Sequence, residues 1–389
     1  MTQRYLGGII TANPTEPSSN LSTASASGMW TLQEALSFYR AGDWPDPANT
    51  PSIGLIKGGY AASAPTNTVA KIVPESAGNA TDFGDLSASN YSMGALSSDT
   101  RSIAVGGYYN NSAATNIIEY FTFASASNAT DFGDISSASY YTVGISNNVR
   151  GVFALGYVGG GANTIEYITI PSTGNSIDFG DLTSTRYGSS SVASTTRGVF
   201  AGGYDSGGND SNVIDYITIA TTGNASDFGD LTVGRSYFHG GANSSTRGVF
   251  GSGLDGSTYL NTLDYITIAS TGNATDFGDS TASTYGSCGT SNSTRGIFAG
   301  GQDTGGRLNI IEQIEISTTG NATDFGDLLT VASFIAGTCS GNPAVQPAYN
   351  ISALATSSAS PLGFFGGGTE YYSLIKYFTI ATDGQFFFF

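Results

Sequence analysis

The chain has 389 residues, 54 of them glycine, and thirty acidic against thirteen basic side chains give a formal charge of −17. Proteins that hold phosphate backbones need a surplus of Lys and Arg on one face, so this balance argues against a nucleic-acid partner. Two cysteines cannot form a disulfide framework, and no apolar run is long enough to cross a bilayer. The first twenty residues lack the basic and apolar regions of a secretory signal. We therefore expect a globular protein with no membrane insertion and no secretion.

Residues 1–50 lie outside the pattern that fills the rest of the chain. Thr31-Leu32-Gln33-Glu34 is a capping box, and the apolar residues after it share one helical face as far as Gly42. A lone helix of about ten residues is unstable in water, so it must dock on the rest of the protein or on another chain. We predict an N-terminal attachment segment, 1–50, with one short helix.

From residue 51 the sequence repeats every 47–49 residues, as the tetrapeptide Asp-Phe-Gly-Asp shows. It begins at Asp82, Asp131, Asp178, Asp227, Asp276 and Asp324. An apolar run closed by glycine and a β-rich segment such as 165–170 each recur seven times. Each unit predicts four strands: the apolar run, the β-rich segment, the Asp-Phe-Gly-Asp strand after a Gly-Asn turn, and a strand of small residues. Four antiparallel strands per repeat are typical of a propeller blade. The predicted fold is all-β: a seven-bladed β-propeller over 51–389.

The repeat also predicts how the blades pack. Small residues in the fourth strand suit the crowded axis, and the tetrapeptide phenylalanines are expected to wedge between neighbouring blades: Phe83, Phe132, Phe179, Phe228, Phe277 and Phe325. The last unit stops inside its outer strand, so ring closure must come from the N-terminal segment or be incomplete. The tail, 386–389, is expected to pack into that seam or into a partner subunit. The 19 extra residues of the last interval, within 340–361, are expected to form a surface excursion.

Charged residues recur at fixed positions in the units. The arginines that open the apolar strand are expected to pair with the tetrapeptide aspartates: Arg101, Arg150, Arg197, Arg247 and Arg295. The twelve aspartates suit either calcium or a turn pinned by side-chain to backbone hydrogen bonds. Their constant spacing favours the second interpretation. We therefore predict no metal site and no cofactor.

Loop lengths separate the framework from a variable surface. The β-rich strand and the tetrapeptide are always 13 positions apart, whereas the distance from the closing glycine to that strand varies from 7 to 11. Variable lengths indicate exposed loops, and in a propeller these loops share one face. Their residues are the predicted ligand-binding set: Tyr60, Tyr108, Tyr109, Tyr157, Tyr204, Asp205, Asn209, Asp255, Tyr259 and Asp303.

Catalytic chemistry finds little support in the sequence. His239 is the single histidine, and no Gly-x-Ser-x-Gly elbow accompanies it. Cys288 and Cys339 fall on inner-type strands of neighbouring units. We expect two isolated buried thiols there, and a disulfide between them is the alternative. We predict no catalytic residues and no enzymatic activity.

Two resemblances extend this interpretation. The order of landmarks over 52–389 resembles the kelch repeat, although Phe replaces the usual Trp, and Leu155 and Ser252 replace the first glycine of the pair. A weaker likeness is to the Asp-box turn of sialidase propellers. The segments 4–8 and 28–32 resemble the opening of virion structural proteins from tailed phages of marine cyanobacteria.

The resemblances imply a non-enzymatic virion structural protein, a tail fibre or other adhesin, made in the host cytoplasm. Residues 1–50 would attach to other virion proteins, and the variable loops would bind a host-surface glycan or protein receptor. The alternatives are a purely architectural virion subunit and a sialidase-like or polysaccharide-degrading enzyme. Whether the chain forms a homo-oligomer is left open.

Overall fold

The computed structural model describes residues 51–238 and 240–345, together with the backbone of strands β31 (Leu362–Phe365) and β32 (Lys376–Thr379). The chain divides into two units, one of residues Ser52–Gln346 and one that combines Met1–Pro51 with Pro347–Phe389. The predicted N-terminal helix, the two phage-like segments, His239 and the aromatic tail lie outside the described residues. Among the residues described, no helix is long and apolar enough to cross a membrane.

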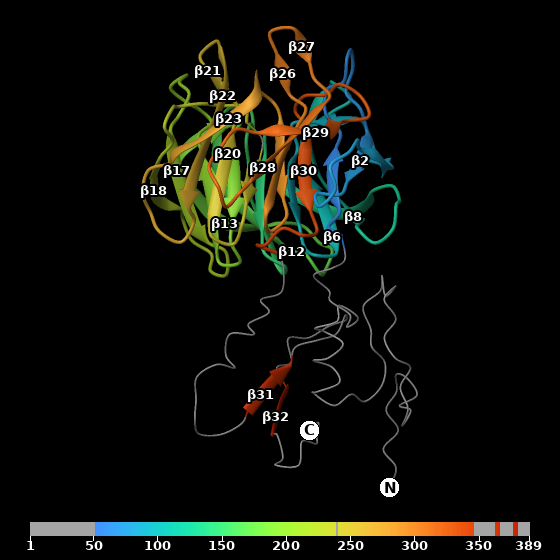
Figure 1. Cartoon of the computed structure of the whole chain (residues 1–389), viewed down its shortest axis with the longest axis vertical. Coiled ribbons are helices and arrows are strands. Elements are labelled where there is room, and N and C mark those ends of the chain that lie inside the picture. Colours follow the sequence, from blue (N-terminus) through green and yellow to red (C-terminus); the bar gives the residue numbers. More distant parts are fainter. Residues whose placement is uncertain (1–50, 239, 346–361, 366–375, 380–389) are drawn as a thin grey trace. The chain divides into compact units, whose positions relative to one another are not determined.

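The described part of Ser52–Gln346 is a β-propeller of six blades, each built on four antiparallel strands (Figure 1). The strands of each blade are given from the axis outward. The first three blades are β30 (Ala336–Cys339), β1 (Gly54–Lys57), β2 (Thr68–Ile72), β3 (Thr81–Asp85); β5 (Gly94–Ser97), β6 (Arg101–Val105), β8 (Ala113–Thr122), β9 (Thr130–Ser139); and β10 (Val143–Ser146), β11 (Arg150–Ala154), β12 (Ala162–Thr169), β13 (Ile177–Tyr187). The fourth, fifth and sixth blades are β14 (Ser190–Ala193), β15 (Arg197–Ala201), β17 (Val213–Thr218), β18 (Ser226–Asp230); β19 (Ala242–Asn243), β20 (Arg247–Gly251), β22 (Thr258–Thr267), β23 (Thr275–Thr284); and β24 (Cys288–Ser291), β25 (Arg295–Ala299), β28 (Ile310–Glu315), β29 (Thr323–Asp327). Short strands at one face complete the propeller: β4 (Asn90–Tyr91), β7 (Tyr108–Tyr109), β16 (Tyr204–Asp205), β21 (Leu254–Asp255), β26 (Gln302–Asp303) and β27 (Gly306–Arg307).

The prediction of seven blades is wrong, because the ring closes one unit earlier. The first unit has no inner strand upstream of it, and β30 supplies that strand by pairing with β1 in antiparallel register, Gly54 opposite Cys339 and Lys57 opposite Ala336. Closure therefore comes from the C-terminal side of the repeats, contrary to the expected N-terminal segment. The strands of the last sequence unit, β31 and β32, pair with each other in a separate two-stranded sheet.

The phenylalanines of the tetrapeptide lie between blades, as predicted. Phe228 of the fourth blade packs against Phe250, Ile266 and Ile268 of the fifth. All six equivalents are only 2–4% exposed and contact the next blade around the ring. Each blade is too thin to bury its own faces, so these contacts between blades form the core.

Removing one such ring tests the placement. Phe228→Ala leaves a cavity between two blades, and we expect the free energy of unfolding to fall by about 3 kcal/mol. Urea titration measures the loss, with Val149→Ala as the control because Val149 is 60% exposed. A change no larger than that of the control would contradict the packing role of Phe228.

The arginines at the start of each second strand do not pair with the tetrapeptide aspartates, and that prediction is wrong. The Arg150 guanidinium lies 4.4 Å from the centroid of the Tyr167 ring in its own blade. It donates a hydrogen bond to the Ile219 carbonyl of the next blade, at 3.0 Å. The same bond to the third-strand end of the next blade is made by Arg101, Arg197, Arg247 and, across the closure to Pro74, Arg295. These arginines therefore tie each blade to the next.

The Gly-Asn turns meet the tetrapeptide of the preceding blade. The Asn224 side-chain oxygen accepts a hydrogen bond from the Asp181 main-chain N–H at 3.1 Å, and the Ala225 N–H donates to the Asp181 carbonyl at 2.7 Å. The same Asn contact occurs at all six blade boundaries. The aspartate side chains were expected to accept hydrogen bonds from the backbone of the turn. In the structure, the Asn side chains are the acceptors, and the aspartates contribute their main-chain N–H and carbonyl groups. The tetrapeptide glycine is required here, since a Cβ on Gly180 would lie 2.5 Å from the Gly223 carbonyl oxygen.

Small residues line the axis, as predicted. The inner strands line a narrow cavity of about 70 Å³, with walls made mainly of Gly, Ala, Ser and Thr and some larger apolar side chains such as Leu96 and Ile145. Its lining includes Asn342 and Ala344, and the Asn342 amide contacts the Asn243 side chain. Residues 340–345 therefore enter the axis, and Ala344 is 2% exposed, which corrects the expected surface excursion for this part of 340–361. Cys288 and Cys339 are buried free thiols, and burial raises the pKa of each to about 12.

Candidate functional site

One face of the propeller carries two kinds of connection. In an antiparallel blade, the loop between the second and third strands emerges on the same side as the segment that leads from the outer strand to the next blade. The hairpins near β21, β26 and β27 mark this face at the top of Figure 1, and we call it the loop face. The variable loops predicted from the sequence therefore share it with the segments that precede each inner strand.

Backbone bridges on the loop face join each outer-strand end to the loop of the next blade. Tyr91 pairs with Tyr108, Tyr140 with Tyr157, and Tyr187 with Tyr204. The other three bridges join Ser236 to Leu254, Tyr285 to Gln302 and Ser333 to Tyr60. These bridges set a circle of twelve side-chain positions around the axis.

Seven consecutive positions of this circle are tyrosines, all half-buried. We call them the tyrosine arc: Tyr60, Tyr91, Tyr108, Tyr140, Tyr157, Tyr187 and Tyr204. Each ring contacts the next, with centroids 5.1–5.6 Å apart and mostly tilted or edge-on. Such geometries are favourable between aromatic rings. The arc is therefore a continuous aromatic surface across the first four blades.

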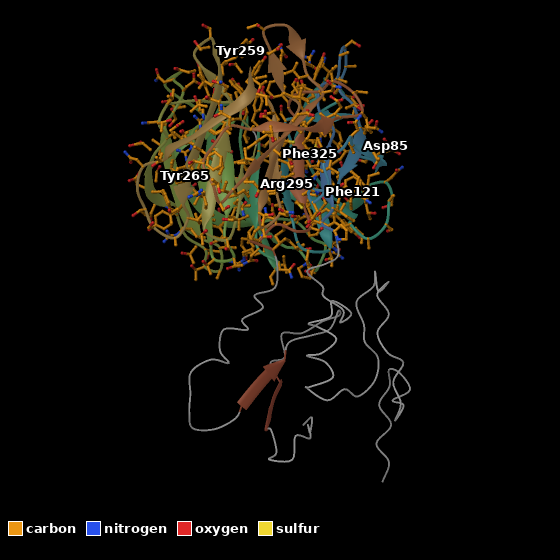
Figure 2. All side chains as sticks on the ribbon, viewed as in Figure 1. Asp85, Phe121, Tyr259, Tyr265, Arg295 and Phe325 are labelled. Atoms are coloured by element: carbon orange, nitrogen blue, oxygen red, sulfur yellow. The ribbon has the colours of Figure 1, made fainter. Side chains whose placement is uncertain are left out.

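The remaining part of the circle has a different composition. Ser236, Leu254, Gln302 and Ser333 replace tyrosine, and Tyr285 stacks on the loop residue Tyr259 with centroids 5.2 Å apart. In Figure 2, Tyr259 lies at the loop face, whereas Tyr265 lies lower in the same blade. The loop face is therefore asymmetric, with an aromatic side and a more polar side.

Three aromatic rings meet inside the circle, and we call them the aromatic plug: Tyr141, Tyr237 and Phe334. Their centroids are 5.2–6.5 Å apart. They occupy alternate blades, and the equivalent residues between them are small: Ser92, Gly188 and Gly286. Main-chain bonds link these positions in succession, such as Tyr237 N–H to the Gly188 carbonyl and Phe334 N–H to the Gly286 carbonyl. Six bulky rings would collide at the axis, and the alternation leaves room for three.

The plug residues have a costly backbone conformation. Tyr141, Tyr237 and Phe334 have φ of 56°, 56° and 55°, in the left-handed region that bulky residues rarely adopt. Strain of this kind costs about 1–3 kcal/mol per residue and is concentrated at functional sites. The strained conformation places three large rings at the centre of the loop face.

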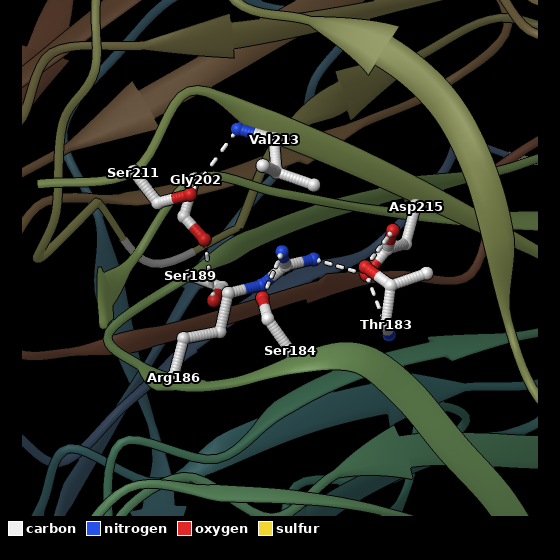
Figure 3. Close-up of polar contacts among 8 residues, drawn as sticks. All are labelled: Thr183, Ser184, Arg186, Ser189, Gly202, Ser211, Val213 and Asp215. Carbon is white, nitrogen blue, oxygen red and sulfur yellow. Dashed lines mark hydrogen bonds and ion pairs between the residues drawn. The ribbon is translucent and has the colours of Figure 1, made fainter. Parts of the chain in front are cut away.

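Two buried ion pairs join neighbouring blades close in sequence to the aromatic residues, and Figure 3 shows one of them. The Arg186 guanidinium, next to Tyr187, lies 2.7 Å from the Asp215 carboxylate, and both side chains are inaccessible to solvent. Thr183 donates to the same carboxylate through its N–H at 3.2 Å and its hydroxyl at 2.7 Å. Burial lowers the pKa of Arg186, and the adjacent Asp215 partly offsets this effect. The pair joins the third blade to the fourth, one residue before Tyr187.

The same design recurs at other blade boundaries. Arg235, two residues before Tyr237, pairs with Asp264 at 3.0 Å in the next blade. The equivalent acids Glu119, Glu166 and Glu312 are longer and accept hydrogen bonds from Ser87, Ser136 and Thr281 of the preceding blade without an arginine. The shorter aspartate leaves room for a guanidinium, so the Asp-Arg pairs and the lone glutamates fill similar spaces.

Burial and neighbouring phenols favour the uncharged form of four tyrosines on this face. The pKa values of Tyr91, Tyr140, Tyr141 and Tyr237 are raised, first by desolvation and then, in part, by neighbouring tyrosines. An ionised phenol would be unfavourable in this environment. These four tyrosines therefore present neutral rings and hydroxyl groups at the loop face.

The predicted binding residues fall into three groups. Tyr60, Tyr108, Tyr157 and Tyr204 belong to the tyrosine arc, and Tyr259 contacts Tyr285 on the same face. Tyr109 lies apart, with its hydroxyl 3.0 Å from that of Ser87, and burial raises its pKa to about 12. Whether any of these residues binds a ligand stays a prediction.

The polar residues of the predicted set mainly organise their own loops. The Asp205 carboxylate accepts hydrogen bonds from the N–H groups of Gly207 and Asn209, which lowers the pKa of Asp205. Asp303 does the same for Gly305 and Gly306. Asp255 is exposed at the tip of its hairpin. Within the described residues, no group of three or more His, Cys, Asp or Glu is placed to hold a metal ion.

Sequence reasoning missed the second half of the aromatic surface. These residues precede the inner strands: Tyr91, Tyr140, Tyr141, Tyr187, Tyr237, Tyr285 and Phe334. The sequence pattern predicts a strand of small residues at the axis for the whole of their segment, although aromatic residues recur in this segment in every unit. That recurrence was the available signal.

Comparison of the chain with known protein families finds no matching family. Comparison with curated proteins finds no match either. The β-propeller fold is therefore established by the structure, and the kelch and phage resemblances rest on the sequence motifs.

Proposed function

We propose that this protein is a non-enzymatic adhesin whose loop face binds a glycan on a host-cell surface. The observation that carries the proposal is the unbroken tyrosine arc on the face that also carries the variable loops. Sugar rings have apolar faces that stack on aromatic side chains, and phenol hydroxyls bond sugar hydroxyls. Apolar side chains that gather on one face of a protein also mark interaction sites in general.

The scaffold suits such a role. The arc is fixed by backbone bridges, buried ion pairs and packing between blades, so little conformational entropy is lost when a ligand binds. The loops around it vary in length between blades without changing the framework. A rigid platform with variable loops is a common arrangement for recognition proteins.

Attachment to a virion is the second part of the proposal. Ser52 and residues 339–341 lie together where β1 begins and β30 ends, because the Ser340 N–H donates to the Ile53 carbonyl. Strand direction puts this junction, where the described propeller begins, at the face opposite the loop face. This placement is compatible with residues 1–50 joining other virion proteins, as in a tail fibre, while the loop face meets the host.

Glycan binding is tested with Tyr108→Ala and Tyr157→Ala in the full chain. We expect each to weaken binding to the preferred glycan on an array at least tenfold, equivalent to about 1.4 kcal/mol. The matched control is Tyr265→Ala, a half-buried tyrosine that stacks under Arg247 away from the loop face. Thermal melting of all three variants is the control that checks whether each one is folded.

Three outcomes separate the candidate functions. A protein that binds no glycan but binds other virion proteins through the loop face would be an architectural subunit. Release of sugar products from host polysaccharide would instead make it an enzyme. Equal loss of glycan binding in the arc variants and in Tyr265→Ala would overturn the role of the arc.

A further inference from the structure

The gap in the circle of tyrosines contains a cation. Arg307, on β27 of the sixth blade, has its guanidinium carbon 4.3 Å from the centroid of the Tyr60 ring, the first ring of the arc. Its Nε donates to the Ser333 hydroxyl at 3.2 Å, and an Nη atom reaches the Ala62 carbonyl at 3.4 Å. Burial raises the pKa of Tyr285, and the charge of Arg307 partly offsets this effect. Arg307 therefore lies at the Tyr60 end of the tyrosine arc, beside Ser333.

This cation is distinctive among the basic residues of the described propeller. Lys57, Arg186 and Arg235 are buried, and Lys71 lies within β2. The remaining five arginines begin the second strands at the opposite face: Arg101, Arg150, Arg197, Arg247 and Arg295. Among the described basic residues, Arg307 is therefore the one that lies on the loop face with its side chain partly accessible to solvent.

Nearby carboxylates do not neutralise Arg307. No ion pair to it occurs within the described part of the chain. Asp303, on the same hairpin, uses its Oδ1 to accept the N–H groups of Gly305 and Gly306, at 2.7 and 2.9 Å. The Arg307 guanidinium is thus held in place by the Tyr60 ring, the Ser333 hydroxyl and the Ala62 carbonyl, and its other N–H donors are left for a ligand.

We propose that Arg307 selects an acidic group on the bound glycan, a carboxylate or a sulfate, while the adjoining sugar ring stacks on Tyr60. The planar guanidinium matches the paired oxygens of either group, and its contact with Tyr60 fixes the orientation in advance. The neutral rings of the arc would hold the uncharged sugars that follow. The ligand class is therefore an acidic oligosaccharide with a neutral segment, and this inference rests on the proposed glycan binding.

The experiment compares the full chain with Arg307→Gln and Arg307→Lys on an array. The array holds matched glycans that share one backbone and carry a uronic acid, a sulfate ester or neither. We expect the wild type to bind an acidic form at least tenfold more tightly than the neutral form, and added salt to reduce that preference. Arg307→Gln should lose the preference and keep the neutral affinity, and Arg307→Lys should retain part of it. Arg247→Gln, at the opposite face, is the matched control.

The two acid classes and the two proposals give different results. Preference for only the uronic acid or only the sulfated form identifies the group that Arg307 recognises. Glycan binding with no acidic preference, or with a preference that Arg307→Gln leaves intact, overturns this inference and leaves the proposed function standing. Absence of any glycan binding overturns both. Wild-type binding to carboxyl-reduced glycans repeats the uronic acid test without any substitution.

Discussion

Asp215→Ala is expected to lower the free energy of unfolding by about 5 kcal/mol. Breaking a buried ion pair typically costs 3–5 kcal/mol, because the surviving charge stays buried without a partner. Here the Arg186 guanidinium would remain inaccessible to solvent, and the Thr183 N–H and hydroxyl would also lose their acceptor. Urea titration monitored by tyrosine fluorescence measures the change.

The neighbouring strand offers a matched control for this variant. Asp227 lies directly opposite Asp215 in the β17–β18 register and is exposed, so Asp227→Ala should change stability by less than about 0.5 kcal/mol. The double variant Arg186→Met, Asp215→Leu should recover most of the loss, because apolar residues of similar size often replace a buried pair without cost. Equal effects of Asp215→Ala and Asp227→Ala would show that the pair does not stabilise the seam.

Lys57→Met is expected to stabilise the propeller near neutral pH and to change its pH dependence. Lys57 lies in β1 at the ring closure, is fully buried, and donates to Ser102 Oγ at 2.9 Å and Thr338 Oγ1 at 3.0 Å. Desolvation lowers its pKa from 10.5 to about 7, against weaker opposing effects of Cys288 and Glu119. The unfolded chain therefore binds more protons than the folded chain between about pH 7 and 10.5.

The sign of the pH effect follows from this difference. A lowered pKa of a lysine means that folded-state stability rises with pH across the window from about 7 to 10.5, at up to about 1.4 kcal/mol per pH unit. Below about pH 7 Lys57 is charged in both the folded and the unfolded chain, so the full cost of burying that charge lowers the stability of the fold. Lys57→Met removes this slope, and the gain near pH 7 should approach about 4 kcal/mol. The Ser102 and Thr338 hydroxyls, 2.7 Å apart, remain bonded to each other.

The measurement is the free energy of unfolding of both proteins at several pH values from 6 to 10. Other titrating groups are present in both proteins, so the difference between the two curves reports Lys57 together with its coupling to Cys288 and Glu119. Lys71→Met, on the adjoining strand β2 with a half-buried side chain, is the control and should leave the slope unchanged. Parallel stability curves for the wild type and Lys57→Met would contradict the prediction.

Much of the framework was predictable because the repeat exposes it. The constant 13-residue spacing marked the β17–β18 hairpin, and the recurring Phe228 position predicted a wedge that the structure places between two blades. The sequence also located half of the aromatic surface, at Tyr60, Tyr108, Tyr157 and Tyr204. Each of these features depends on local spacing within one unit, which a single sequence records.

The tertiary structure alone decided the features that depend on which units become neighbours. A count of repeats does not say which unit supplies an inner strand to another, so the pairing of β30 with β1, and hence six blades, followed only from the closed ring. The Arg150 contact reaches the adjoining blade, where the sequence suggested an aspartate partner within the same blade. The Asn224 contact also joins two blades, and the sequence predicted no partner for it. The tyrosine arc likewise joins Tyr91 to Tyr108 across a boundary between blades. Local periodicity determined the blade, and burial of its faces against other blades determined the ring and its aromatic face.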